Sequence, residues 1–443
     1  MTNNAQKSYT IYSNFSEKNL EKSLYNGYVQ ILKEELLPAM GCTEPISLAY
    51  ASALARKTLD SVPTKVNIEV SGNILKNVKS VIVPNSNGLK GVTAAAAAGI
   101  VAGREDKVLQ VLSSVSEDEK EKIKQYHDST EFNVSQSTSE CVFDIKVTVF
   151  NGDNNASVRI EGHHTNVIEI TKNGEILHQG EETGDANADM HDRSILSIKK
   201  IVEFADEVNL VDVKDILERQ IEYNSAICKE GLTNDYGANV GKVLLKAFGD
   251  GVHNKAKATA AAGSDARMNG CSLPVVIVSG SGNQGITASM PVVVYAQHLN
   301  SSKEELLRAL VVSDLVTIHL KTGIGRLSAY CGAVSAGAGA GAGIAYLMGG
   351  KFDEVAHTVV NALAIDSGLI CDGAKSSCAA KIASAVESGL LGMEMYRQGN
   401  QFYGGDGILE RGVENTIDNV GTLARVGMKE TDEEIIKLMI KNI

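Results

Sequence analysis

The sequence predicts an α+β protein in which N-terminal helices join a mainly helical C-terminal part and an α/β part with an antiparallel sheet is inserted between them. Three observations predict this class. The last third is rich in Ala and Gly and has no proline after Pro291, which is typical of packed helices. Residues 142–150 alternate between apolar and polar and are followed at once by Asn-Gly, which favours a hairpin. Apolar residues at helical spacing fill residues 20–37.

Along the chain, we expect a flexible polar tail at residues 1–18 and N-terminal helices within 19–62 that dock onto the helical part. The α/β part is expected at residues 63–210 and the helical part at 211–443. Expected strands are 65–70, 80–83 and the hairpins 142–150/156–161 and 167–171/175–178, the second with Asn-Gly at its turn. Residues 117–126 have helical spacing.

The composition of the chain argues against some classes of binding partner and indicates in which cellular compartment the protein acts. Lys and Arg number 42 against 54 Asp and Glu, a net charge of −12, which argues against nucleic acid or an anionic membrane as partner. Residues 332–350 are uncharged but so rich in Gly that a close-packed helix is favoured over a membrane span. Helices this rich in Gly and Ala would also tolerate the close approach of a second copy of the chain in a homodimer. Seven cysteines without a secretory signal indicate the reducing cytoplasm and thiols used for metal binding or catalysis.

A glycine-rich turn at residues 280–285 has the spacing G-x-G-x-x-G. A dinucleotide site would also need a second parallel strand that ends in an acidic residue, and the sequence lacks that strand. We therefore interpret the segment as a turn. Either it is a plain tight turn, or its N–H groups together with Asn283 and Gln284 hold a small carboxylate.

Three late cysteines are candidates for a metal centre. Cys371 and Cys378 would stand about 10.5 Å apart along an unbroken helix, too far for one small cluster. Gly373 allows a loop between them, so that both sulfurs can converge with Cys331 from another glycine-rich turn. Three thiolates suit an iron–sulfur cube with one open iron better than structural zinc. The alternative is that the cysteines are buried spectators.

The segment Gly41-Cys42-Thr43-Glu44-Pro45 lies where two predicted helices meet. The N–H groups of a helix start would lower the pKa of Cys42 and make it a nucleophile or general base. The alternative is an ordinary helix cap with a buried thiol. Thr43 beside it is a candidate for substrate binding.

Further substrate-binding candidates lie elsewhere in the sequence. His163 and His164 occupy a loop between two predicted strands, where histidines act in acid–base chemistry or bind carboxylates, although idle loop histidines are commoner. Arg326, five residues before Cys331, is a nearby cation for a substrate carboxylate.

In combination, the segment 41–45, the turn 279–285 and the set Cys331, Cys371 and Cys378 resemble the L-cysteine desulfidase family, which is related to the alpha chain of iron–sulfur L-serine dehydratases. The resemblance implies that these three cysteines hold a [4Fe–4S] cluster whose open iron engages a small amino acid. It implies that Cys42 acts in catalysis, and that L-cysteine is degraded to sulfide, pyruvate and ammonia.

The resemblance leaves other activities open. Serine dehydratases have a histidine in the corresponding early motif, so the thiol of Cys42 favours the cysteine-degrading branch. One alternative is an L-serine dehydratase or deaminase-like lyase, and another is a cluster-containing sensor or binding protein without turnover.

Overall fold

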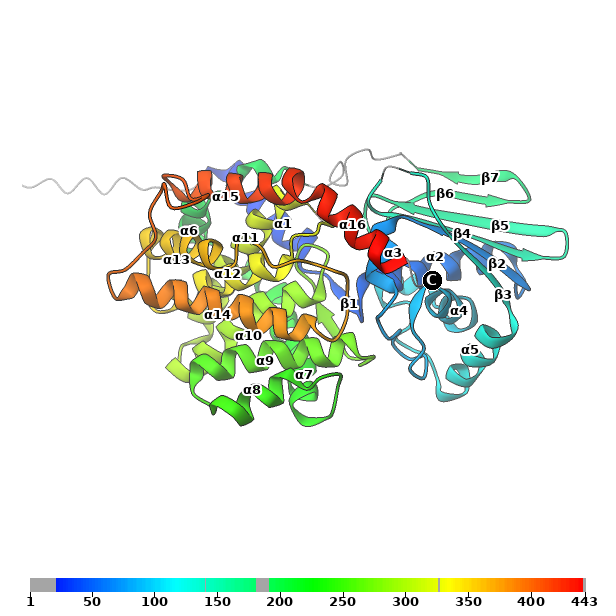
Figure 1. Cartoon of the computed structure of the whole chain (residues 1–443), viewed down its shortest axis with the longest axis horizontal. Coiled ribbons are helices and arrows are strands. Elements are labelled where there is room, and N and C mark those ends of the chain that lie inside the picture. The colour runs from blue at the N-terminus through cyan, green and yellow to red at the C-terminus, as the bar shows by residue number, and fades with distance from the viewer. Residues whose placement is uncertain (1–20, 140, 181–190, 326, 441–443) are drawn as a thin grey trace, which may run out of the picture.

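The computed structural model describes residues 21–139, 141–180, 191–325 and 327–440. A helical part and an α/β part lie side by side along the long axis of the molecule (Figure 1). The α/β part contains α2 (Thr43–Leu59), β2 (Lys65–Val70), α3 (Gly72–Val78), α4 (Gly91–Ala102), the 3₁₀ helix η1 (Glu105–Gln110), α5 (Glu117–Ser129), β3 (Glu131–Gln136), β4 (Asp144–Asn151), β5 (Asn154–Glu161), β6 (Val167–Lys172) and β7 (Glu175–Gln179).

The remaining elements belong to the helical part or connect to it. They are α1 (Lys22–Glu35), β1 (Pro38–Met40), η2 (Arg193–Ile195), α6 (Ile198–Glu207), η3 (Leu210–Asp212), α7 (Lys214–Thr233), α8 (Val240–Phe248), α9 (Val252–Met268), β8 (Pro274–Val276), α10 (Gly282–Leu299), α11 (Lys303–Ile324), α12 (Gly332–Leu347), α13 (Phe352–Ile365), α14 (Cys378–Arg397), α15 (Val413–Thr422), the π-helical turn η4 (Leu423–Gly427) and α16 (Lys429–Ile440).

Six strands form the large sheet in the order β3-β2-β4-β5-β6-β7. Both predicted hairpins are present as β4–β5 and β6–β7, and Asn173 and Gly174 have positive φ at the second turn. The sheet is mixed, because β3 pairs with β2 in parallel while all other neighbours are antiparallel. Residues 80–83, expected as a strand, contribute only one bridge, between Ile82 and Lys90. The predicted α+β class is confirmed.

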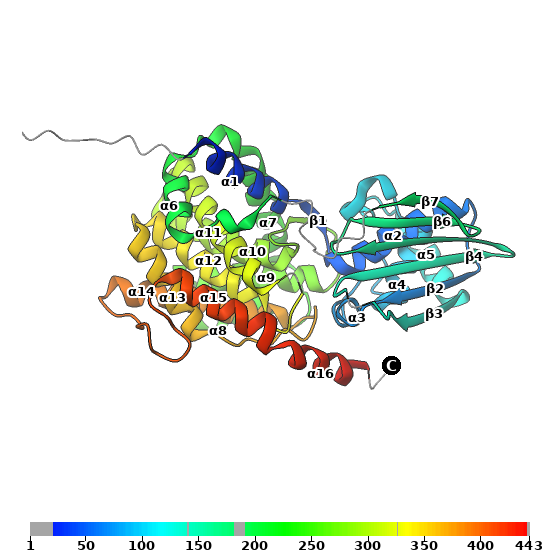
Figure 2. The ribbon, with the colours of Figure 1, turned by 90° about the horizontal axis from the view of Figure 1, so that it is seen from above.

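Helix α2 packs on the sheet, whereas we expected both N-terminal helices to dock onto the helical part. It contacts β4, β5 and α4, and Figures 1 and 2 show it on one face of the sheet. A Cβ at Gly99 of α4 would lie 2.1 Å from the carbonyl oxygen of Ala49, so the two helices approach closely. An Ala-rich helix that is buried on nearly all sides carries no pattern that indicates its partner. By contrast, α1 contacts α11, and α6, within the range expected for the α/β part, packs on α11 and α13.

Most of the segment 332–350 forms α12, which contacts α10, α11, α13 and α14. Glycines allow this packing: a Cβ at Gly389 of α14 would lie 2.2 Å from the carbonyl oxygen of Gly337 on α12. None of the helices in the described ranges is long and apolar enough to cross a membrane.

Two connections hold the parts together near the start of α2. Strand β1 pairs antiparallel with β8, so the chain leaves the helical part immediately before Cys42. Gly41 has φ +63° and lies against Pro84, which permits the sharp turn into α2. At the other end of the chain, α16 runs from the helical part to α3 (Figures 1 and 2), where Lys76 pairs with Asp432. The tail expected at residues 1–18 lies outside the described residues.

Candidate active site

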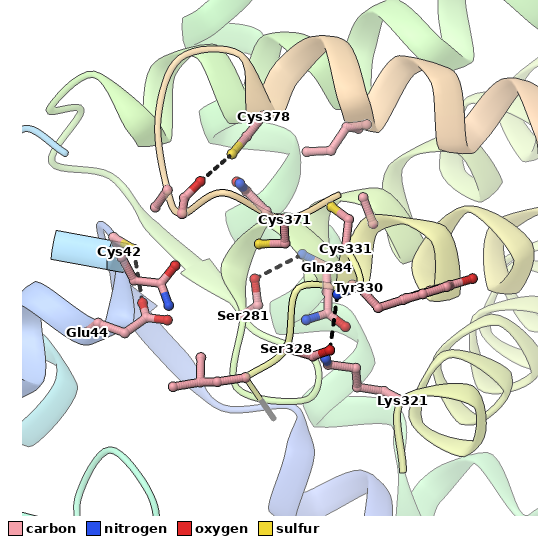
Figure 3. Close-up of a pocket in the computed structure, with 18 of the residues that line it drawn as sticks. Cys42, Glu44, Ser281, Gln284, Lys321, Ser328, Tyr330, Cys331, Cys371 and Cys378 are labelled. Atoms are coloured by element: carbon pink, nitrogen blue, oxygen red, sulfur yellow. Dashed lines mark hydrogen bonds between the residues drawn. The ribbon is translucent and has the colours of Figure 1, made fainter. Parts of the chain in front are cut away.

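A cavity that is partly open to solvent is lined by residues from both parts of the molecule. From the α/β part come Cys42, Glu44 and Asn77; the helical part supplies Arg267, Ser281, Asn283, Gln284, Lys321, Leu327, Ser328, Tyr330, Cys331, Gly332, Ala333, Cys371, Gly373, Ala374, Cys378 and Ile382. Figure 3 shows the three late cysteines grouped on one side, with Cys42 and Glu44 across from them. The early motif and the late cysteines, far apart in sequence, therefore share one cavity.

Backbone hydrogen bonds between two loops set Cys331 and Cys371 side by side. Cys331 N–H donates to Leu369 O at 2.9 Å, and Cys371 N–H donates to Ala329 O at 2.6 Å. Cys331 directly precedes α12, and Cys378 is the first residue of α14. Between Cys371 and Cys378 the chain turns at Gly373, whose φ is +90°. The expectation of a loop rather than an unbroken helix at this spacing is therefore correct.

The thiols of Cys331 and Cys371 interact directly. The hydrogen bond between them lowers the pKa of Cys371 and raises that of Cys331. Burial raises the pKa of Cys378. Lysines 76, 321, 375 and 381 provide positive charge around these thiols. Lysine charges favour the ionised form of sulfur, which is the form that binds metal.

The donor chemistry of the three late cysteines fits an iron–sulfur cluster, because thiolates are the ligands that hold such clusters. Cys331, Cys371 and Cys378 line one cavity. In the described ranges, no group of three or more His, Cys, Asp or Glu side chains is placed to hold a single metal ion. Three soft ligands would leave one iron without a protein ligand.

Cys42 precedes α2 as its N-cap residue and is 3% exposed. It packs with Val81 and Met268 and against Ala374 and Cys378, so it lies beside the loop that carries the late cysteines. Its thiol donates a hydrogen bond to Glu44 Oε2 at 3.0 Å.

The expectation that the helix start lowers the pKa of Cys42 is wrong. Burial, then the neighbouring Glu44 carboxylate, raises the pKa well above its ordinary value, and the positive charge of Arg267 offsets this only in part. Desolvation outweighs the helix terminus because the thiol is enclosed. Cys42 and Glu44 thus form a hydrogen-bonded pair with the proton on sulfur.

Two of the expected substrate-binding residues, Asn283 and Gln284, line the cavity. They lie in the first turn of α10, which follows β8 after the turn at Gly280. Because β8 pairs only with β1 among the described strands, this glycine-rich turn is not part of a dinucleotide-binding βαβ unit. Thr43 does not line the cavity; its hydroxyl donates to Gly280 O at 2.9 Å and so ties α2 to this turn.

The structure does not bring His163 and His164 to the cavity. They follow β5, and His164 is buried against Phe143 with ring centroids 4.8 Å apart, while its carbonyl accepts a hydrogen bond from Ser47. These contacts hold the loop to the inside of the α/β part. Arg326, the expected carboxylate ligand, lies outside the described residues.

Sequence reasoning missed Glu44 as the partner of Cys42 and missed Arg267 entirely. Glu44 lies in the segment 41–45, near the candidate base Cys42. A carboxylate two residues from a candidate base is a signal that the sequence contains. Arg267 is 2% exposed at the end of the Ala-rich α9. An arginine at the end of a segment made mostly of Ala and other small residues is unusual, and this was its signal.

Fold and cavity together define a thiol-rich α+β protein whose site is assembled between two parts. The family model for the serine dehydratase alpha chain matches residues 106–437. Among similar proteins, a UPF0597 protein of Desulfitobacterium hafniense is 59% identical over 94% of this chain and 97% of its own length. UPF0597 proteins of Lachnoclostridium phytofermentans and Treponema denticola are 49% and 46% identical over 94% and 96% of this chain and the whole of theirs.

The chain belongs to the serine dehydratase alpha chain family. This membership supports a lyase-type enzyme that acts in amino-acid catabolism. The predicted resemblance is thereby confirmed for the serine dehydratase alpha chain family; the names of the relatives state no substrate and do not confirm the L-cysteine desulfidase assignment.

Proposed function

We propose that the protein is an iron–sulfur-dependent lyase that degrades L-cysteine to sulfide, pyruvate and ammonia in the cytoplasm. One observation carries the proposal: Cys42 and the thiols of Cys331, Cys371 and Cys378 line the same cavity. In this proposal the three late cysteines hold a [4Fe–4S] cluster with one open iron. When bound, such an iron supplies Lewis-acid chemistry toward a substrate sulfur, oxygen or carboxylate.

The chain's own residues provide the proton transfer. Cys42 passes its thiol proton along the 3.0 Å hydrogen bond to Glu44, and the resulting thiolate takes the α-proton of the substrate. The electron pair left on Cα forms the Cα–Cβ double bond as hydrosulfide leaves from Cβ. The released aminoacrylate tautomerises to an imine, and water hydrolyses it to pyruvate and ammonia.

The high pKa of Cys42 makes its thiolate costly to form and, once formed, a strong base. An α-proton is weakly acidic, so a base that is strong once ionised removes it more readily. Glu44 is the nearby group that allows ionisation, because it accepts the proton directly. Burial of Cys42 also keeps the thiol away from bulk oxidants and water.

L-Serine is the second candidate substrate, because the family model that matches the chain is that of the serine dehydratase alpha chain. The elimination is the same, with hydroxide in place of hydrosulfide as the leaving group.

The experiment is anaerobic reconstitution with iron and sulfide, followed by assays of sulfide from L-cysteine and pyruvate from L-serine. Cys42→Ala should lower turnover at least about 100-fold, as expected for loss of a general base. Its iron content should be unchanged. Glu44→Gln should also lower kcat, because the amide cannot accept the thiol proton.

The matched control is Cys228→Ala, which removes a buried thiol of α7 that does not line the cavity. This variant should keep wild-type turnover. Full activity of Cys42→Ala would overturn the role of Cys42. A wild-type protein that holds the cluster but turns over neither amino acid would overturn the lyase and leave a sensor or binding protein.

A further inference from the structure

Arg267 is a buried cation without a protein partner in the described part of the chain. The residue is 2% exposed and lines the cavity. No hydrogen bond or ion pair joins it to another described residue, and its buried Nε has no acceptor. An unpaired buried charge is costly, so natural proteins rarely keep one unless it serves a ligand.

Other cations near the late cysteines already have carboxylate partners. Lys76 pairs with Asp432, and Lys375 and Lys381 both pair with Asp372. Arg267 has no such partner among the described residues, so its charge is available to an anion in the cavity.

The start of α10 provides a second anion-binding feature at the same place. A Cβ at residue 282 would lie 2.4 Å from Arg267 Nε, so the guanidinium lies directly against Gly282, the first residue of this 18-residue helix. The Ser281 hydroxyl accepts from Gln284 N–H, and the preceding N–H groups of Gly282 and Asn283 have no partner within the helix. A guanidinium beside free helix N–H groups matches a carboxylate.

We infer that Arg267 and the first turn of α10 bind the α-carboxylate of the substrate. This inference rests on the proposed function and deepens it: it restricts substrates to compounds with a free carboxylate, here small α-amino acids, and it assigns a specificity-determining residue. Held there, the substrate has its Cα between Arg267 and the late cysteines, within the cavity that Cys42 also lines.

Calorimetric titration of the reconstituted protein tests the inference with three probes. L-Alanine has the carboxylate and ammonium but no leaving group, propionate lacks the ammonium, and ethylamine lacks the carboxylate. Wild type should bind L-alanine and, more weakly, propionate, but not ethylamine. Arg267→Met should weaken binding of L-alanine and propionate about 100-fold, as expected for loss of a charge-assisted pair of hydrogen bonds.

Arg267→Lys should fall between wild type and Arg267→Met, because lysine keeps the charge but loses the planar fork. The control Lys255→Met removes an exposed cation from the same helix and should bind both probes as wild type does. Binding of L-alanine to Arg267→Met at wild-type affinity would overturn the inference.

The melting temperature without ligand separates a binding role from a structural one. Since Arg267 has no described partner, Arg267→Met should melt at the same temperature as wild type or higher. A marked decrease would indicate a structural arginine and refute the proposed role.

The inference and the proposed function can fail separately. Arg267-dependent binding of propionate without turnover of any amino acid would leave the carboxylate site standing and refute the lyase. If Arg267→Met still turned over L-cysteine with wild-type kcat and KM, the lyase would stand and the carboxylate site at Arg267 would be refuted.

Discussion

Asp314 on α11 offers a quantitative test of the helical core. It has no exposed surface, and its Oδ1 accepts a hydrogen bond from Gln220 Nε2 at 2.9 Å. Its Oδ2 has no partner among the described residues. Burial raises the pKa of this carboxyl from 3.8 to about 7. Asp314 is therefore a neutral acid in the folded protein at mildly acidic pH.

The free energy of unfolding should fall as the pH rises. Because the folded-state pKa lies above the unfolded-state pKa, the stabilisation is complete below pH about 4 and is lost as the pH rises through about 7. A difference of about 3 pKa units, at about 1.4 kcal/mol each, amounts to about 4 kcal/mol by pH ~8. Relaxation around the ionised carboxylate makes this an upper bound.

Asp314→Asn replaces the acid with a neutral group of the same shape and should remove this dependence. Urea unfolding followed by circular dichroism should give similar free energies for wild type and variant near pH ~4. Near pH ~8 the variant should be more stable, by up to about 4 kcal/mol. Asp418→Asn, at an exposed position of α15, is the control and should not change with pH in this way. If the free energies of unfolding of Asp314→Asn and wild type differed by the same amount at both pH values, the reasoning would be refuted.

Two further variants test the cysteine site and the helix packing. Cys378→Ala should lose most of its iron after anaerobic reconstitution, measured by iron and sulfide content and visible absorption, whereas Cys228→Ala should retain it; equal iron in both would contradict the ligand set. Gly389→Ala should lower the free energy of unfolding by about 1–3 kcal/mol, because its Cβ would collide with α12. Gly368→Ala, where a Cβ meets nothing within 4 Å, should have little effect on the unfolding midpoint, and a similar loss in both variants would exclude the packing explanation.

Local patterns predicted much of the fold. The hairpins β4–β5 and β6–β7 follow from alternation and Asn-Gly turns, which act between residues close in sequence. Strand β3 was missed, since its side chains are mostly exposed at the sheet edge and its apolar alternation is limited to Phe132 and Val134. The parallel pairing of β3 with β2 depends on α3, α4 and α5 between them, a tertiary arrangement with no local signal.

The site was predictable where the chemistry of the residue was itself the signal. Thiols in a Gly- and Ala-rich region stand out, and the loop at Gly373 follows from the spacing of the flanking cysteines. The pKa of Cys42 was predicted with the wrong sign, because a helix start was visible in the sequence and the burial was not. Arg267 was missed because its meaning depends on the absence of a described partner, which only three-dimensional packing reveals.

The site is divided between the two parts of the molecule, and this division explains why the turn at residues 280–285 is rich in glycine. Thr43 donates to Gly280 O, so this turn meets the α/β part directly behind Cys42. Two residues later, Gly282 lies against Arg267, and Gln284 lies over Gly332, next to Cys331. One short turn thus contacts Thr43 beside Cys42, the buried arginine and the loop of the late cysteines. Larger residues at positions 282 and 332 would separate these groups, so the glycines here set the distance between the Cys42 segment and the late cysteines rather than cradling a phosphate.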